Sequence, residues 1–318
     1  MAAYGEPDVL RTGKLPDPVP DAGHAVVAVR AAALNWHDVL VRRGRYASPL
    51  PHVPGADGAG IDVETGDEVV VVPSLHWGSD ESAPGPRWEI LGDTRPGTYA
   101  ELVRVPRECV APRPPGLTWA QAAALPVVGL TTYRALLTRG RLRAGERLLV
   151  LGAGGGVATM AVGVGAALGA TVVVTSSAED KIARARELGA VGGVRYDDPD
   201  WPEAAAALAG GGFDLVLDSV GSWAGSIRAL RPGGRLVVLG ASRAEQVQLD
   251  VRPFYFGQYD LLGTTLGSPA DFAGLLRLLE AHDVPPPVID RTFPLDGAAE
   301  AHAHLESGTG FGKTVLTI

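Results

Sequence analysis

The chain has 318 residues, of which 46% are hydrophobic and 20% charged, and its net charge is −8. This composition is typical of a soluble globular protein, and the length allows two domains. The acidic charge and the lack of any basic block argue against nucleic acid as a partner. No apolar run approaches the ~20 residues of a membrane span, and no secretory signal opens the chain, so we expect a cytoplasmic protein without a membrane partner.

The first 115 or so residues are expected to form a β-rich domain. Short β-rich runs occur at Ala25–Ala31, Glu68–Val72 and Tyr99–Val105, and proline and glycine punctuate them. Such a pattern is typical of an antiparallel or barrel-like domain of short strands.

From about residue 118, helical and strand patterns alternate. Thr118 and Gln121 predict a capped helix start, and Gly129–Leu136 resembles the beginning of another helix. Strands are then predicted at Leu148–Leu151, Thr171–Thr175, Gly192–Tyr196, Phe213–Leu217 and Arg235–Leu239, and helices at Val157–Leu168, Ala178–Leu188, Pro202–Leu208 and Trp223–Leu230. This alternation predicts an α/β domain with a doubly wound parallel sheet.

A glycine cluster follows the first of these strands. The segment from Arg147 to Ala158 reads R-L-L-V-L-G-A-G-G-G-V-A and joins a strand to a helix. Glycines at such a turn let the backbone approach a pyrophosphate, and the helix N-terminus offers N–H groups to the phosphates. We therefore expect Gly154, Gly155, Gly156 and Val157 to bind a dinucleotide.

The end of the second strand favours NADP(H) as the cofactor. The strand V-V-V-T ends in Ser176 and Ser177, where NAD-binding domains place a carboxylate for the ribose hydroxyls. Hydroxyls and the nearby Lys181 suit a 2′-phosphate instead, and Tyr196 ends the third strand near the same place. The alternative is that Lys181 and its neighbour Arg195 are ordinary surface charges.

The chain resembles the medium-chain dehydrogenase/reductase superfamily, in its quinone oxidoreductase-like branch. The motifs that carry the resemblance include A-A-A-L-N-W-H-D (31–38), V-P-G-A-D-G-A-G (53–60), the glycine turn, D-L-V-L-D-S-V-G (214–221) and F-G-K-T-V-L (311–316). It implies a Rossmann domain, residues 118–284, inserted in a GroES-like catalytic domain, residues 1–117 and 285–318. It also implies a homodimer or homotetramer.

The resemblance bears on metal content as well. Zinc-dependent relatives place ligands where this chain has Asn35, Ala56 and a residue near Val128, and four structural cysteines in the lobe corresponding to Ser74–Glu89. The single cysteine, Cys109, lies outside that lobe, so we expect no metal site of the usual kind. An unusual site from His37, His52, Asp57 and His76 stays open. His302 and His304 are expected to be solvated.

Three residues of the first domain are candidates for catalysis by resemblance. Asn35 matches an asparagine near the nicotinamide, and Tyr46 either donates to the substrate oxygen or packs as an aromatic. His37 falls where zinc relatives have a proton-relay hydroxyl, or it packs at the domain interface. Further cofactor contacts are expected from Thr131, Ser219, Gly221, Gly240 and Ala241. Lys313 either reaches the cofactor or bridges surface acids.

Without zinc, the favoured reaction is one whose substrate is already electrophilic. We expect NADPH-dependent reduction of a quinone or an α,β-unsaturated carbonyl by hydride transfer. One alternative is an alcohol dehydrogenase with an unconventional metal site. The other is a non-catalytic NADPH-binding sensor or partner protein.

Overall fold

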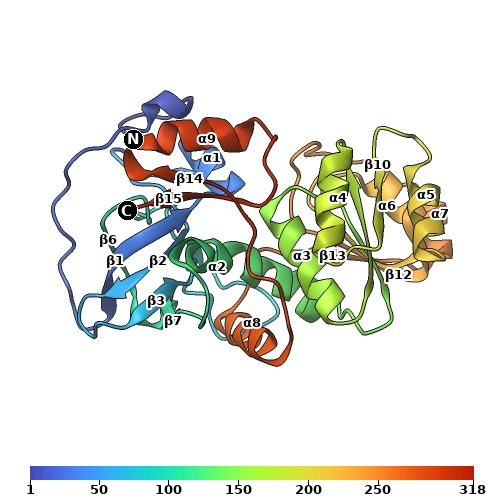
Figure 1. Cartoon of the computed structure of the whole chain (residues 1–318), viewed down its shortest axis with the longest axis horizontal. Helices are drawn as coiled ribbons and strands as arrows, with labels where there is room; N and C mark the ends of the chain where they lie inside the picture. Colours follow the sequence, from blue (N-terminus) through green and yellow to red (C-terminus); the bar gives the residue numbers. More distant parts are fainter. The chain divides into compact units, whose positions relative to one another are not determined.

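The computed structural model describes residues 1–318, which form two compact units. Unit 1 comprises Met1–Val128, Ser268–Ala273 and Pro286–Ile318, and unit 2 comprises Gly129–Gly267 and Gly274–Pro285. Figure 1 shows both, coloured from blue at the N-terminus to red at the C-terminus. None of the helices combines the length and the apolar character needed to cross a membrane.

Unit 1 is built on a seven-stranded sheet in the order β14-β15-β1-β2-β3-β7, with β6 also paired to β1. Its strands are β1 (His24–Ala33), β2 (Asp57–Asp62), β3 (Glu68–Val71), β6 (Leu102–Pro106), β7 (Val110–Pro112), β14 (Ile289–Pro294) and β15 (Lys313–Thr317). All pairs are antiparallel except β14 with β15. The predicted antiparallel β-rich domain is confirmed, and Figure 1 shows red β15 beside blue β1, from opposite ends of the chain.

Shorter elements complete unit 1. They are η1 (Pro7–Val9), α1 (Trp36–Arg42), η2 (Arg107–Cys109), η4 (Leu295–Gly297), α9 (Ala298–Glu306) and a small separate sheet of β4 (Ser74–Leu75) and β5 (Glu89–Ile90). Trp77 is buried beside this small sheet, with its ring edge against Trp88. Two tryptophans therefore pack against each other in this lobe, which contains no cysteine.

Unit 2 contains a six-stranded parallel sheet in the order β10-β9-β8-β11-β12-β13. Its strands are β8 (Arg147–Val150), β9 (Thr171–Ser176), β10 (Gly192–Arg195), β11 (Phe213–Asp218), β12 (Leu230–Val238) and β13 (Asp260–Gly263). Its helices include α3 (Gly156–Ala167), α4 (Glu179–Glu187), α5 (Trp201–Ala209), α6 (Trp223–Ala229) and α7 (Val251–Phe256). Figure 1 shows α3 and α4 on one face and α5 and α6 on the other. This is the doubly wound dinucleotide-binding order, so the predicted Rossmann sheet is confirmed.

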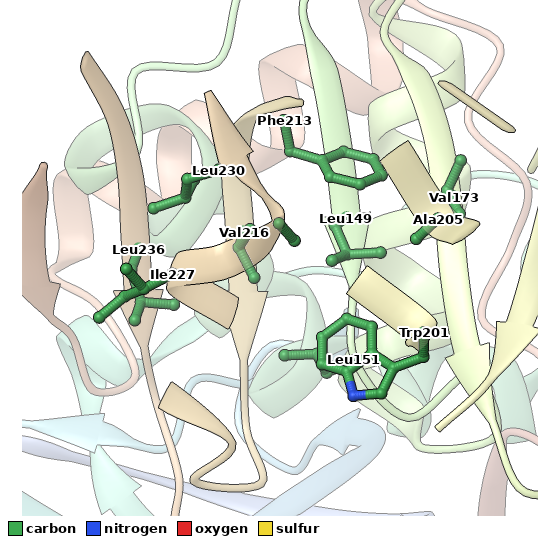
Figure 2. Close-up of a cluster of buried hydrophobic side chains, with 11 residues drawn as sticks. Leu149, Leu151, Val173, Trp201, Ala205, Phe213, Val216, Ile227, Leu230 and Leu236 are labelled. Carbon is green, nitrogen blue, oxygen red and sulfur yellow. The ribbon is translucent and has the colours of Figure 1, made fainter. Parts of the chain in front are cut away.

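The core of unit 2 explains why its strands read as continuous apolar runs. Figure 2 shows Leu149, Val173, Val216 and Leu236, one from each of four neighbouring strands, in a single buried cluster with Trp201 of α5. A parallel sheet covered by helices on both faces has no solvent side, so its strands lose the polar alternation of antiparallel strands.

One predicted boundary is wrong. A second helix was expected to begin at Gly129, but α2 runs unbroken from Trp119 to Tyr133, with Pro126 inside it, and continues as a π-helical segment, Arg134–Arg139. Proline interrupts helical hydrogen bonding, and here the next N–H, that of Val127, donates to the Asp57 carboxylate at 2.7 Å. A side chain distant in sequence thus accepts the hydrogen bond of this backbone N–H group.

The remaining helix is α8 (Pro269–Ala281).

The turn after β11 depends on the buried carboxylate of Asp218. Its two oxygens accept the backbone N–H groups of Val220, Gly221 and Ser222 at 2.8–3.0 Å and the Ser226 hydroxyl at 3.0 Å. Donors that are buried or partly buried are costly to leave without an acceptor, so this one side chain fixes the start of α6.

We expect Asp218→Ala to lower the free energy of unfolding by about 3 kcal/mol, because the N–H donors lose their acceptor. Asp218→Asn keeps one acceptor oxygen and should cost less. Chemical denaturation measures both, with the exposed helix-cap residue Asp250 changed to alanine as the control. A loss no larger than that of the control would contradict the assigned role.

Candidate active site

The predicted site residues are divided between the two units. Asn35, His37, Tyr46 and Lys313 belong to unit 1. Unit 2 holds Thr131, Gly154, Gly155, Gly156, Val157, Ser176, Ser177, Lys181, Tyr196, Ser219, Gly221, Gly240 and Ala241. Each group is described within its own unit.

Three buried polar side chains of unit 1, Asn35, Asp57 and Lys313, form what we call the Asp57 cluster. The Lys313 ammonium donates to Asp57 Oδ2 at 2.9 Å and also to Asn35 Oδ1. The Asn35 amide donates to the same Asp57 oxygen at 2.9 Å. Lys313 therefore pairs with a buried acid, which differs from the surface acids that the sequence suggested.

Strand register brings the Asp57 cluster together. Asp57 and Lys313 are the first residues of β2 and β15, which flank β1 on either side. In β1, Ala33 pairs with Asp57 on one side and with Val315 on the other, and the chain reaches Asn35 two residues later. The cluster thus closes one end of three adjacent strands.

A second polar group, which we call the His37 pair, joins His37 of α1 to Asp93. His37 Nε2 hydrogen-bonds the Asp93 carboxylate, and both side chains are partly exposed. Burial alone lowers the pKa of His37, but the hydrogen bond and charge of Asp93, with a smaller effect of Asp38, raise it above its ordinary value overall. The ring of Tyr46 lies 4.6 Å from the imidazole, centroid to centroid. Two of the predicted catalytic residues, His37 and Tyr46, are therefore in contact.

Behind these residues lies a fully buried chain of polar groups. The Asp38 carboxylate accepts the Asn35 N–H at 2.8 Å and the Tyr99 hydroxyl at 3.2 Å, and that hydroxyl lies 3.3 Å from His302 Nε2. Burial raises the pKa of Asp38 to about 6 and lowers that of His302 to about 3. His302 is thus a neutral, buried imidazole at pH 7.

The expectation that His302 and His304 are solvated is wrong. His302 has no exposed surface, and His304 is half-buried, with Nε2 2.6 Å from Asp290 Oδ2. The two-residue spacing does place them on different sides of α9, but Tyr99 contacts His302 and Asp290 binds His304.

The unusual metal set that the sequence left open is not assembled. His37 pairs with Asp93, Asp57 with Lys313, and His52 Nε2 lies 2.6 Å from the Gly92 carbonyl oxygen. His76 has only Glu89 as an acidic neighbour, at 3.9 Å. No three His, Cys, Asp or Glu side chains lie close enough together to hold a metal ion.

In unit 2 the glycine turn presents free backbone donors at the start of α3. Gly152 has φ +78°, a conformation that favours glycine, and Gly155 caps the helix without any side-chain hydrogen bond. The first intrahelical acceptor is the Gly155 carbonyl, bound by the Thr159 N–H at 2.9 Å. The N–H groups of the first turn thus suit the phosphates of a dinucleotide.

The other predicted cofactor residues of unit 2 mostly follow the carboxyl ends of strands. Ser176 ends β9, and its backbone oxygen accepts the Tyr196 N–H at 3.2 Å, so these two residues are adjacent. Ser219 and Gly221 follow β11, and Gly240 and Ala241 follow β12, whereas Lys181 lies on α4 and Thr131 is buried in α2. A Cβ on Gly240 would lie 2.8 Å from the Ser219 carbonyl oxygen. The loops after β11 and β12 can therefore approach this closely only because residue 240 is glycine.

Four residues of these networks had no role predicted from the sequence: Asp38, Asp93, Tyr99 and Asp218. Asp38 carried a usable signal, because it stands three residues after Asn35, the spacing of a capping box. Asp218 is also an acid at the end of an apolar strand. Asp93 and Tyr99 have no local signal, since their partners lie 56 and 203 residues away.

We expect Lys313→Met to lower the free energy of unfolding by about 3–5 kcal/mol, because it leaves the Asp57 carboxylate buried without its cation. The double variant Lys313→Met/Asp57→Asn, which removes both charges, should recover most of that loss. Denaturant unfolding measures the effect, with the exposed Lys14→Met as the control. A double variant as unstable as the single one would show that charge burial is not the cause.

Known proteins match the chain over its whole length. Residues 21–115 match the family model for the alcohol dehydrogenase GroES-like domain, and residues 156–281 that for zinc-binding dehydrogenase. A zinc-type alcohol dehydrogenase-like protein of Leptosphaeria maculans is 31% identical, with 97% of this chain and 94% of that protein covered. Mouse quinone oxidoreductase is 29% identical, with 99% and 96% covered. The crystal structure of a NAD-dependent alcohol dehydrogenase superposes with a TM-score of 0.94 at 39% identity, covering 100% of this chain and 98% of that one.

These matches confirm the expected architecture, a Rossmann domain combined with a GroES-like domain. They also show that the protein is an oxidoreductase of a family that uses a nicotinamide dinucleotide and small-molecule substrates. The chain belongs to the medium-chain dehydrogenase/reductase superfamily.

Proposed function

We propose that this protein reduces quinones or α,β-unsaturated carbonyls with NADPH, by hydride transfer that needs no zinc. The observation that carries the proposal is the Asp57 cluster, in which a lysine ammonium lies beside the position of a zinc ligand. The quaternary structure, a homodimer or homotetramer, stays a prediction.

The residues present do not fit a catalytic zinc ion. Asn35 stands in the place of one ligand, and its amide is already hydrogen-bonded to Asp57 and to the Lys313 ammonium. The resemblance places the other two ligands at Ala56 and near Val128, and neither of these two side chains has a ligand atom. The Asp57 carboxylate, an acid beside Asn35, is already engaged by the Lys313 ammonium and by the Val127 N–H, so it is not free to bind a metal ion.

The residues of unit 2 do fit a bound dinucleotide, and they favour NADPH over NADH. The open N–H groups at the start of α3 suit the pyrophosphate. At the end of β9, Ser176 and Ser177 replace the carboxylate that would repel a 2′-phosphate, and Lys181 and Tyr196 add a cation and a hydroxyl.

The chemistry follows from the His37 pair. When bound, the nicotinamide supplies a hydride to the electrophilic carbon of the substrate. The protonated His37 then donates its proton to the developing enolate or phenolate oxygen, and Asp93 keeps the imidazole charged and oriented for that transfer. Tyr46 packs against the imidazole and limits its rotation. Asn35 anchors the start of α1 and so fixes where His37 lies.

A second candidate is oxidation of an alcohol with NAD. The similarity to a crystal structure named as a NAD-dependent alcohol dehydrogenase, at 39% identity, favours it. The two functions differ in cofactor, in metal content and in the direction of hydride transfer.

One experiment separates them. Purified protein, dialysed against a chelator, is assayed for NADPH oxidation with 1,4-benzoquinone and with but-3-en-2-one, and for NAD reduction with a panel of alcohols; its zinc content is measured in parallel. We expect reduction of a quinone or enone that survives chelation. Stoichiometric zinc with alcohol oxidation would establish the second candidate. Tight NADPH binding without any turnover would favour a non-catalytic sensor.

The His37 pair also predicts a pH profile. Because the pKa of His37 is raised, its protonated form persists above its ordinary range, and kcat should fall as pH rises through that raised pKa. Asp93→Asn removes the charge that raises it, so the alkaline limb of the profile should move down by about one pH unit.

The matched control is Asp290→Asn, which weakens a different histidine–aspartate pair of unit 1, between Asp290 and His304. It should leave the profile in place. An alkaline limb that moves equally in both variants, or in neither, would remove His37 as the proton donor.

A further inference from the structure

One cation of unit 2 lies beside the expected ribose site without a carboxylate partner. The guanidinium carbon of Arg243 stands 4.4 Å from the centroid of the Tyr196 ring, stacked over its face. Arg243 is exposed, and its side chain makes no hydrogen bond or ion pair in the structure. Stacking uses the face of a guanidinium and leaves the N–H groups at its edge available.

The backbone around Arg243 is held firmly. The N–H groups of Arg243 and Ala244 both donate to the Val220 carbonyl oxygen, at 3.0 and 3.3 Å. Gly221 has φ +90°, and a Cβ there would lie 2.6 Å from the Ala244 carbonyl oxygen. The loop after β12 therefore packs directly on the turn after β11, the turn that Asp218 organises.

Tyr196 places this cation at the end of β9. Its N–H donates to the Ser176 carbonyl oxygen, and the residue before it, Arg195, pairs in register with Ser176. In sheets of this topology the residue at the end of the second strand contacts the adenosine ribose. The guanidinium of Arg243 thus stacks on the residue whose N–H is hydrogen-bonded to Ser176, at the expected ribose position.

The other arginine at this edge is already engaged. The Arg195 guanidinium binds both carboxylate oxygens of Asp197, with Nε 3.0 Å from Oδ1. Asp197 neutralises that charge locally, whereas nothing neutralises Arg243. Of the two arginines near Ser176, Arg243 is the one with a charge and in-plane donors to offer.

We propose that Arg243, stacked on Tyr196, binds the 2′-phosphate of NADPH and thereby sets the preference for NADPH over NADH. This inference rests on the proposed use of NADPH. A guanidinium edge offers two parallel N–H donors to one phosphate, and the tyrosine face orients that edge. NADH has a hydroxyl at the same place, so it gains little from the charge.

The test is a pair of binding titrations, NADPH and NADH, on the full chain with no substrate present. Because a hydrogen bond to a charged group contributes about 1.5 kcal/mol or more, Arg243→Ala should weaken NADPH binding about tenfold. The Kd for NADH should change less than about twofold. Arg252→Ala, which removes another exposed arginine of the same unit, is the control and should change neither. Arg243→Lys, which keeps the charge but not the planar donor pair, should lie between.

The outcomes separate this inference from the proposed function. If the unaltered protein binds NADPH no more tightly than NADH, the proposed cofactor is wrong and the inference falls with it. If the protein prefers NADPH but Arg243→Ala keeps the full preference, only the role of Arg243 is overturned. Equal weakening of NADPH and NADH would show that Arg243 contacts a part common to both, and would overturn its role as well.

Discussion

The burial of one negative charge, that of Asp57, constrains how distant segments of unit 1 come together. A carboxylate removed from water is unfavourable unless donors surround it. Asp57 receives three, from the Asn35 amide, the Lys313 ammonium and the Val127 N–H. These donors come from the end of β1, from β15 and from α2, so a single side chain ties together segments from the start, the middle and the end of the chain.

The same interaction connects architecture with the proposed chemistry. Asn35 hydrogen-bonds Asp57 and is also the residue from which α1 begins, and His37 is the second residue of that helix. The position of His37, the proposed proton donor, therefore depends on a buried ion pair, and Asp93 raises its pKa. In unit 2, Asp218 has the corresponding structural role, because it shapes the turn against which the loop of Arg243 packs.

Local sequence patterns predicted most of the fold. The alternating strands and helices of unit 2 and the glycine turn are visible in the sequence because each depends on residues within a few positions of one another. The capping box at Thr118 and Gln121 is also present, with N–H to side-chain distances of 3.0 and 3.3 Å. The error at Gly129 arose because the acceptor that lets α2 pass Pro126 is Asp57, 70 residues earlier.

The candidate site was less predictable, because its geometry depends on distant partners. Resemblance singled out Asn35, His37 and Tyr46, but no local pattern pairs His37 with Asp93 or stacks Arg243 on Tyr196. Lys313 was expected to reach the cofactor or to bridge surface acids, yet its partner is the buried Asp57, 256 residues away. His302 was wrongly expected at the surface. Helical spacing shows which residues share a face of a helix, but it does not show what packs on that face. Here the contact is Tyr99, 203 residues away.

The place of β15 in the sheet has a consequence for the order in which the protein folds during synthesis. β15 lies between β14 and β1, and it carries the cation of the Asp57 cluster. The ribosome makes it after all of unit 2, which ends at Pro285 and whose sheet spans residues 147–263. Unit 2 can therefore complete its sheet while β1 still lacks a neighbour and Asp57 lacks its counter-charge. Until the last residues of the chain are made, the end of β1 that pairs with β15 has an unpaired strand edge.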